Sequence, residues 1–173
     1  LRAQFGVVME RTCSELRGIS CLELEDIVPP KQQIMSSRSF GVPVESVAEL
    51  SEAVATYIAI ATEKLRLQAS VAAALHVFVQ TNRFKDNEPQ YSAGLLVPLP
   101  EPSDDTLVLT HYALLGLKTI FRPGYRYKKA GIMLTLLSDK ATRQRSLFDD
   151  PNARARSARR MAVLDAINRQ FGR

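Results

Sequence analysis

Basic and hydroxyl side chains gather in two stretches of the sequence that contain no acidic residue. Residues 31–41 (KQQIMSSRSFG) carry Lys31 and Arg38 next to Ser36, Ser37 and Ser39. Residues 118–131 carry five cations: Lys118, Arg122, Arg126, Lys128 and Lys129. Such donors suit a nucleic-acid backbone, because they contact phosphates without reading bases. A charged edge strand that prevents aggregation has the same composition, so the residues alone leave both interpretations open.

A second candidate is the pentapeptide Gln144-Arg-Ser-Leu147-Phe148, which has the pattern Q-x-x-L-F. It lies in a polar, basic stretch in which no helix or strand is expected to bury the Leu-Phe pair. Such a pair can anchor in an apolar pocket of another protein, with the glutamine amide orienting it. The pattern predicts a protein-binding peptide in the tail.

Catalytic constellations are not found in the sequence. His76 and His111 have no Cys or carboxylate at metal-ligand spacing, and no basic neighbour activates Cys13 or Cys21. Three acidic pairs are better explained by turns and helix starts: Glu25-Asp26, Asp104-Asp105 and Asp149-Asp150. The phosphate-binding patterns G-x-x-x-x-G-K-[ST] and G-x-G-x-x-G are missing. The residues therefore predict a binding function and no catalytic site.

The composition is that of an ordinary globular domain. The chain has 173 residues, of which 46% are hydrophobic and 24% charged. No apolar run approaches the ~20 residues of a membrane span, and no signal peptide is visible, so we expect a cytoplasmic protein. The net charge of +5 comes from the C-terminal tail, because residues 140–173 hold nine Lys/Arg against three Asp/Glu. Residues 1–139 hold 14 Lys/Arg against 15 Asp/Glu. The concentration of positive charge in the tail suggests a polyanionic partner.

The N-terminal part predicts a helix and a linker. Residues 4–17 place Phe5, Val8 and Leu16 on one stripe of a helix that Gly18 would stop. The Pro29-Pro30 pair then favours an extended path, and we expect a boundary after residue 30. The chain begins with Leu1 instead of Met, so we expect it to be a piece of a longer protein.

Residues 31–138 predict an α+β domain with the element order β-α-β-β-α-β. Expected strands cover residues 31–41, 73–81, 91–99 and 125–137, with prolines 100 and 102 breaking the third. One helix starts at the capping box Ser46-x-x-Glu49, and another runs from Ser103 to Phe121. This is the ferredoxin-like pattern, a four-stranded antiparallel sheet with two helices on one face. Its usual strand order, 4-1-3-2, makes the first and last strands neighbours and brings the cations to one edge. The tail, 139–173, shows helical periodicity only from about residue 158.

Together these stretches resemble the C-terminal region of UmuC-like Y-family translesion DNA polymerases. The resemblance rests on PPKQQIMSSRSFG, FVQTNRFKDNEPQY, YRYKKAGIML and QRSLFDD, and it extends in order through nearly the whole chain. It implies that residues 1–30 are the end of the thumb with its connector. It also implies that residues 31–138 are the little finger, which tracks DNA, and that residues 139–173 are a tail with a clamp-binding motif.

The resemblance also implies roles for particular residues. DNA contacts fall on Ser36, Ser37, Arg38 and Ser39 of the first strand and on Arg126, Lys128 and Lys129 of the last. Gln144, Leu147 and Phe148 would bind the sliding clamp. The parent enzyme would serve error-prone repair in the SOS response, with a UmuD-type accessory subunit and RecA as partners. No acidic residue here corresponds to the Mg²⁺-binding carboxylates of the palm, so this piece alone is expected to bind no metal and to be inactive.

Two other functions are consistent with the sequence. A free-standing ferredoxin-like RNA-binding module would stack bases on exposed aromatics of its central strands, where Phe78 is the only candidate and His76 a poor substitute. In a protein-interaction module, the tail would be the functional part and the sheet inert. Binding of a short primer-template duplex by residues 31–138 without the tail distinguishes our interpretation from the latter.

Overall fold

A computed structural model of the chain describes residues 2–21, 30–85, 87–142 and 151–172, without the side chains of residues 2–4, 151, 153 and 154. The chain divides into two compact units, Leu1–Pro30 and Lys31–Arg173. Among the described residues, no helix is long and apolar enough to cross a membrane.

The first unit contains α1 (Arg2–Leu16), which covers the helix expected at residues 4–17. Gly6 interrupts it with φ 80° and ψ 174°, a backbone conformation that side chains with a Cβ rarely adopt. The apolar stripe of α1 is exposed within this unit: Phe5 is 62%, Val8 74% and Leu16 83% accessible.

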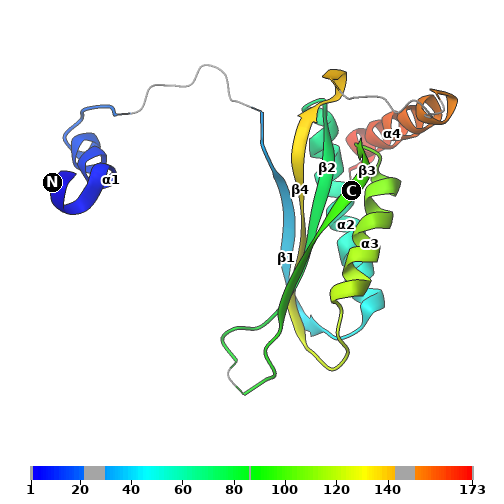
Figure 1. Ribbon diagram of the computed structural model, residues 1–173, viewed down its shortest axis with the longest axis horizontal. Coiled ribbons are helices and arrows are strands. Elements are labelled where there is room, and N and C mark those ends of the chain that lie inside the picture. Colours follow the sequence, from blue (N-terminus) through cyan, green and yellow to red (C-terminus); the bar gives the residue numbers. More distant parts are fainter. Residues whose placement is uncertain (1, 22–29, 86, 143–150, 173) are drawn as a thin grey trace. The chain divides into compact units, whose positions relative to one another are not determined.

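The second unit is built on a four-stranded antiparallel sheet, drawn in Figure 1. The elements follow one another as β1 (Ile34–Val44), α2 (Val47–Leu67), β2 (Ser70–Thr81), β3 (Ser92–Ser103), α3 (Thr106–Ile120) and β4 (Tyr127–Asp139). This confirms the predicted α+β class and the β-α-β-β-α-β order. A short 3-10 turn, η1 (Lys140–Thr142), and α4 (Pro151–Phe171) follow.

The order of the strands in the sheet is β1-β4-β2-β3. The first and last strands are neighbours as predicted, but the expected order 4-1-3-2 is wrong, because β4 and β2 lie in the centre. Burial explains the difference: Leu75 and Val77 of β2 and Ile132 and Leu134 of β4 are fully buried. The serine-rich β1 and proline-rich β3 take the edges, where one side of each strand remains unpaired.

The strand β3 also extends farther than predicted. The sequence suggests that Pro100 and Pro102 end it at residue 99, whereas it continues to Ser103. Proline cannot donate to a neighbouring strand, but an edge strand tolerates it where its N–H would face away from the sheet. The edge position of β3 therefore resolves the apparent conflict.

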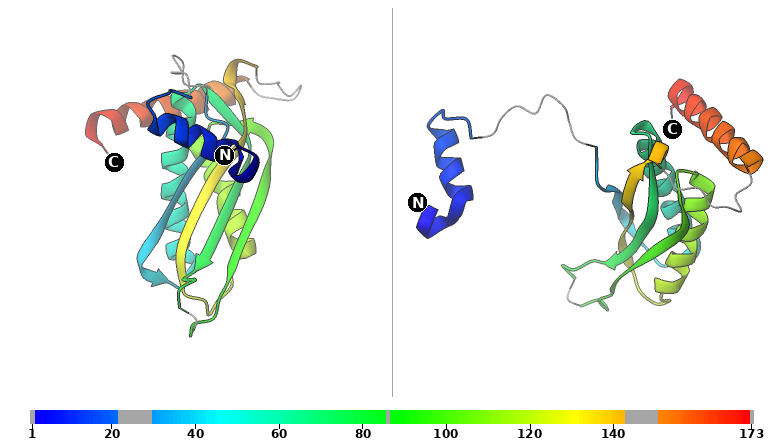
Figure 2. Two further views of the ribbon diagram at one scale, coloured as in Figure 1. Left: turned by 90° about the vertical axis from the view of Figure 1, so that its left-hand side faces the viewer. Right: turned by 45° about the horizontal axis from the view of Figure 1, so that its top comes forward.

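Both α2 and α3 cover one face of the sheet. The left view of Figure 2 looks onto the opposite face, with the two helices behind the strands. Ser46 caps α2 by accepting a hydrogen bond from the Glu49 backbone N–H at 3.2 Å, which is one of the two bonds of the predicted capping box. Asp105 caps α3 in the same way through the Leu107 N–H at 2.8 Å. The apolar faces of both helices join β2 and β4 in one core.

The helix α4 packs against the ends of α2 and α3. Arg66 at the end of α2 donates two hydrogen bonds to the Asp165 carboxylate, at 2.7 and 2.6 Å. Met161 is buried, and Arg160 pairs with Asp105 at 3.3 Å. The helix starts at residue 151 instead of near 158, so the C-terminal residues of the tail are part of the second unit.

The opposite face of the sheet carries no helix among the described residues of the second unit. We call it the open face. Strand alternation and register assign to it the following residues: Met35, Ser37, Ser39, His76, Phe78, Gln80, Ser92, Gly94, Leu96, Lys129, Gly131 and Met133.

Candidate nucleic-acid interface

The pairing of β1 with β4 brings the two predicted basic stretches together. Ser37 pairs with Gly131, Arg38 with Ala130 and Ser39 with Lys129. The hydroxyl-bearing strand and the cationic strand thus lie side by side, as expected from the sequence. A bulge between Ser39 and Val44 interrupts the pairing next to these residues.

The predicted residues nevertheless point to two faces of the sheet. Ser37, Ser39 and Lys129 belong to the open face, whereas Arg38 pairs with Ala130, which is buried under the helices. Burial raises the pKa of Tyr57 on α2, and the positive charge of Arg38 opposes that shift. Arg38 and Ser36 therefore lie on the helix-covered side of the sheet. The cations expected together at this edge are thus divided between its two faces, because successive side chains of a strand point to opposite sides.

The charge of Arg126 is partly neutralised by two carboxylates. Its guanidinium lies 3.2 Å from Glu45 and 3.0 Å from Glu88. Glu88 also pairs with Lys85 at 2.8 Å. The hydrogen bond from Lys85 is the largest cause that lowers the pKa of Glu88, and Arg126 adds to it. Arg126 is thus engaged within the domain.

Two further cations next to or on β4, Lys128 and Arg122, make contacts within the domain. The Lys128 ammonium donates to the carbonyl oxygens of Phe40 and, at 3.0 Å, of Gly41, and so stabilises the bulge of β1. The guanidinium of Arg122 lies 5.0 Å from the centre of the Tyr91 ring, in cation–π geometry. Both cations thus already make contacts within the domain.

Arg38 and Lys129 make no ion pair with any residue in the described part of the second unit. Arg38 is exposed and Lys129 partly exposed. These two are therefore predicted cations that remain available to an anion, one on each side of the same edge.

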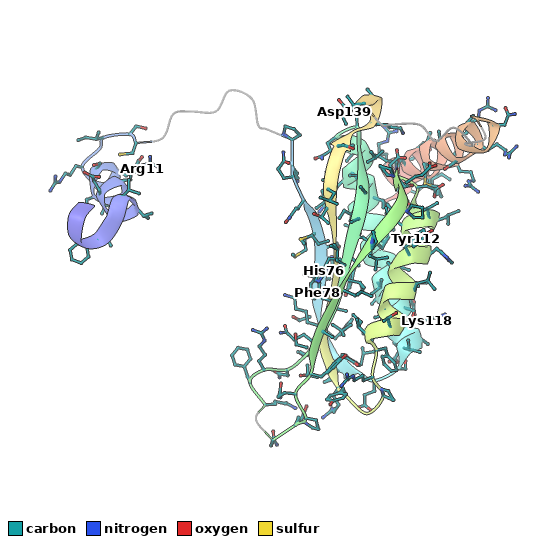
Figure 3. All side chains as sticks on the ribbon, in the orientation of Figure 1. Arg11, His76, Phe78, Tyr112, Lys118 and Asp139 are labelled. Carbon is teal, nitrogen blue, oxygen red and sulfur yellow. The ribbon has the colours of Figure 1, made fainter. Side chains whose placement is uncertain are left out.

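The centre of the open face holds an aromatic pair that was predicted only as the stacking candidates of the RNA-binding alternative and not as contacts for DNA. His76 and Phe78 lie with ring centroids 5.9 Å apart and planes 26° from parallel. Figure 3 labels them next to each other at mid-length of the sheet. The period-2 pattern of residues 75–80, in which apolar residues alternate with His76, Phe78 and Gln80, could have indicated this arrangement.

A small hollow of about 350 Å³ lies where β2 and β3 leave the sheet. It is lined by Gln80, Thr81, Arg83, Gln90, Tyr91 and Ser92. With its amide oxygen turned to Arg83, Gln80 accepts hydrogen bonds from that guanidinium. This brings the exposed Arg83 to the same end of the open face as Lys129, which pairs with Gln80.

Other predicted sites are not tested by this geometry. Gln144, Leu147 and Phe148 lie outside the described residues. Within the described ranges, no three His, Cys, Asp or Glu side chains form a group that could hold a metal ion.

Comparison with known proteins identifies relatives over the whole chain. Residues 31–147 match the model of the impB/mucB/samB family C-terminal domain. Protein UmuC of Salmonella typhimurium strain LT2 is 43% identical over 173 residues, all of this chain and 41% of that protein. Protein ImpB of Salmonella typhimurium is 39% identical over 168 residues, 97% of this chain and 40% of that protein. The chain thus spans about two fifths of the length of these curated relatives. The solved structure titled "Insertion ternary complex of Dbh DNA polymerase" aligns with a TM-score of 0.47 at 10% identity, over 60% of this chain and 28% of that one.

Proposed function

The chain belongs to the impB/mucB/samB C-terminal domain family, and on that premise we propose that it is the DNA-binding C-terminal part of an error-prone translesion DNA polymerase. In this proposal residues 31–138 of the second unit are the little finger, which holds the primer-template by its phosphates, and residues 139–173 are the tail. The observation that carries the proposal is the register of β1 with β4, which puts Ser39 directly opposite Lys129 and Ser37 two residues away on the same face.

Physical reasons favour the β1–β4 edge of the sheet as a contact for the phosphate backbone of DNA. Hydroxyls and amines in one row can reach successive phosphates, and neutralised phosphates release counterions, which gives affinity without sequence preference. A polymerase that copies damaged templates gains from such contacts, because they hold the duplex whatever base lies in the active site. The contacts are assigned to Ser37, Ser39 and Lys129 on the open face, and to Ser36 and Arg38 on the covered side.

The other two predicted cations, Arg126 and Lys128, are assigned a smaller role in DNA binding. Carboxylates engage Arg126 and carbonyl oxygens engage Lys128, so part of the hydrogen-bonding capacity of each is already used within the domain. Their contribution to affinity is therefore smaller than that of Lys129.

A titration of the 173-residue chain with a primer-template duplex at several salt concentrations tests the proposal. If the four assigned cations (Arg38, Arg126, Lys128 and Lys129) each neutralise one phosphate, the logarithm of the association constant falls against log salt with a slope of about −3.6. An affinity that is weak and independent of salt would remove DNA binding as the function and favour the protein-interaction module.

We further propose that Gln144, Leu147 and Phe148 bind the sliding clamp. The support is the Q-x-x-L-F pattern in a chain of this family. The double substitution Leu147→Ala with Phe148→Ala should abolish clamp binding in a pull-down while duplex binding persists. Undiminished clamp binding by this variant would show that the pentapeptide is incidental.

The activity of the whole protein is also a proposal, because the chain covers about two fifths of its relatives. We assign Mg²⁺-dependent nucleotidyl transfer to a palm outside this chain, and we expect a UmuD-type accessory subunit, RecA and a cytoplasmic location for the whole protein. Duplex binding by this chain without nucleotide incorporation is the expected result of a primer-extension assay.

A further inference from the structure

The open face has a flat aromatic centre that two glycines make possible. A Cβ added to Gly131 would lie 2.6 Å from Cζ of Phe78 and 2.3 Å from Cβ of Ser37. A Cβ added to Gly94 would lie 2.6 Å from Nε2 of His76. The Phe78 ring therefore lies over β4 and the His76 ring over β3, each where the neighbouring strand has no side chain.

The surroundings of this pair are uncharged and include two exposed apolar side chains. Met35 is 55% and Leu96 54% accessible, although both are large and hydrophobic. His76 makes no hydrogen bond with a residue in the described part of the chain, so its ring nitrogens are available to a ligand. Exposed apolar groups that cluster on a sheet face mark a binding surface more often than scattered ones do.

Charge selects the class of ligand. Among the described residues assigned to the open face, Lys129 is the only charged one, and none is a carboxylate. Lys129 pairs with both Ser39 and Gln80, and Gln80 contacts the exposed Arg83. Positive charge and a hydroxyl thus lie at one end of a neutral aromatic platform, which complements a chain with anionic phosphates and flat bases.

We propose that His76 and Phe78 form a platform on which unpaired bases of single-stranded DNA stack, while Lys129, Ser39 and Arg83 contact the adjoining phosphates. Bases inside a duplex are stacked on one another and cannot lie on a protein ring, whereas unpaired bases stack on aromatic side chains whatever their sequence. This inference rests on the proposed function and adds to it a site for the unpaired template next to the primer-template junction.

Binding of two DNA substrates tests the inference with the 173-residue chain. One is a blunt duplex, and the other is the same duplex with an unpaired 5′ extension of the template strand. The wild-type chain should bind the extended substrate at least about 5-fold more tightly, the low end of what stacking of one base contributes. Phe78→Leu keeps an apolar cover over Gly131 but removes the π-face, so it should abolish this gain and leave blunt-duplex affinity unchanged.

Two matched controls distinguish the platform from other aromatic sites. Phe84 is 94% exposed in the turn after β2, and His111 is exposed on α3. Phe84→Leu and His111→Ala should preserve the gain from the extension, whereas His76→Ala should reduce it. A loss with Phe84→Leu and none with Phe78→Leu would move the stacking to the turn and overturn the inference.

Fluorescence gives a readout that does not depend on affinity. The sequence has no tryptophan, so Phe78→Trp introduces a single indole at the platform. Its emission should be quenched by a short oligothymidine and by the extended substrate, but not by the blunt duplex. Emission unchanged by all of them contradicts the inference. If wild type fails to bind the blunt duplex while oligothymidine quenches the introduced indole, the platform stands and the proposed grip on the duplex fails.

Discussion

The two faces of the sheet are built for different purposes although they share the same four strands. The covered face is a continuous apolar core in which Leu75, Val77 and Ile132 have no accessible surface. The open face alternates hydroxyls, glycines and an aromatic pair, and it leaves Met35 and Leu96 more than half exposed. The covered face is where burial stabilises the fold, and the open face is free to bind.

The largest difference between the faces should be seen in stability. Leu75→Ala removes a fully buried side chain and should lower the free energy of unfolding by about 2–5 kcal/mol. Leu96→Ala, on the open face, should change it by no more than about 0.5 kcal/mol. Urea denaturation followed by circular dichroism measures both. Equal losses would mean that the open face is buried by something in solution.

A substitution at the closely packed Gly131 on the open face should also lower the free energy of unfolding. Gly131→Ala forces a Cβ against Ser37 and Phe78, which should destabilise the domain by about 1–3 kcal/mol. Gly41→Ala is the matched control, because no atom lies within 4 Å of its added Cβ and its φ is not positive. If the two variants are equally stable, the ring of Phe78 does not lie over Gly131, and the platform loses its geometric basis.

The contrast between free and engaged cations should appear in the salt dependence of duplex binding. Lys129→Ala should reduce the magnitude of the slope by about 0.9, which is the share of one phosphate contact. Lys128→Ala should change the slope less, because its ammonium already bonds to the carbonyl oxygens of Phe40 and Gly41. A larger change for Lys128 would reverse our assignment of the two neighbours.

The smallest expected effect concerns pH. The pKa of Glu88 is lowered in the folded state, chiefly by its hydrogen bond with Lys85. A carboxylate with a depressed folded pKa stabilises the fold above its unfolded pKa, and that contribution is lost as the pH falls through the folded value. The urea midpoint of wild type should therefore fall slightly more below about pH 4.5 than that of Glu88→Gln. Glu52→Gln, which removes a carboxylate from the exposed surface of α2, is the charge-matched control.

Local sequence patterns were sufficient to predict most elements of the second unit. The capping box at Ser46 and the β-branched run before Thr81 depend on neighbours within a few residues, so they can be recognised without knowing the rest of the fold. The pairing of the first and last strands was also predicted, because the element order strongly restricts the topology.

The sequence could not predict which of the cations remain free to bind an anion. Glu45 and Glu88 lie far from Arg126 along the chain, and the bulge that presents the Phe40 and Gly41 carbonyls to Lys128 depends on strand pairing. Residues 118–131 contain no acidic residue, but carboxylates from distant parts of the chain partly neutralise their charge in the folded domain. Likewise, the glycines that open a place for Phe78 and His76 lie on neighbouring strands, and only the register aligns them with the rings.

Composition and periodicity thus determined the α+β class, the helix starts and the concentration of hydroxyls and cations on β1 and β4, because each depends on covalent neighbours. Only the tertiary structure decided which strands became central, which cations kept an unshared charge and which side chains met on the open face. These properties arise from contacts between residues that are distant in the chain, and the free energy of such contacts is decided when the sheet assembles.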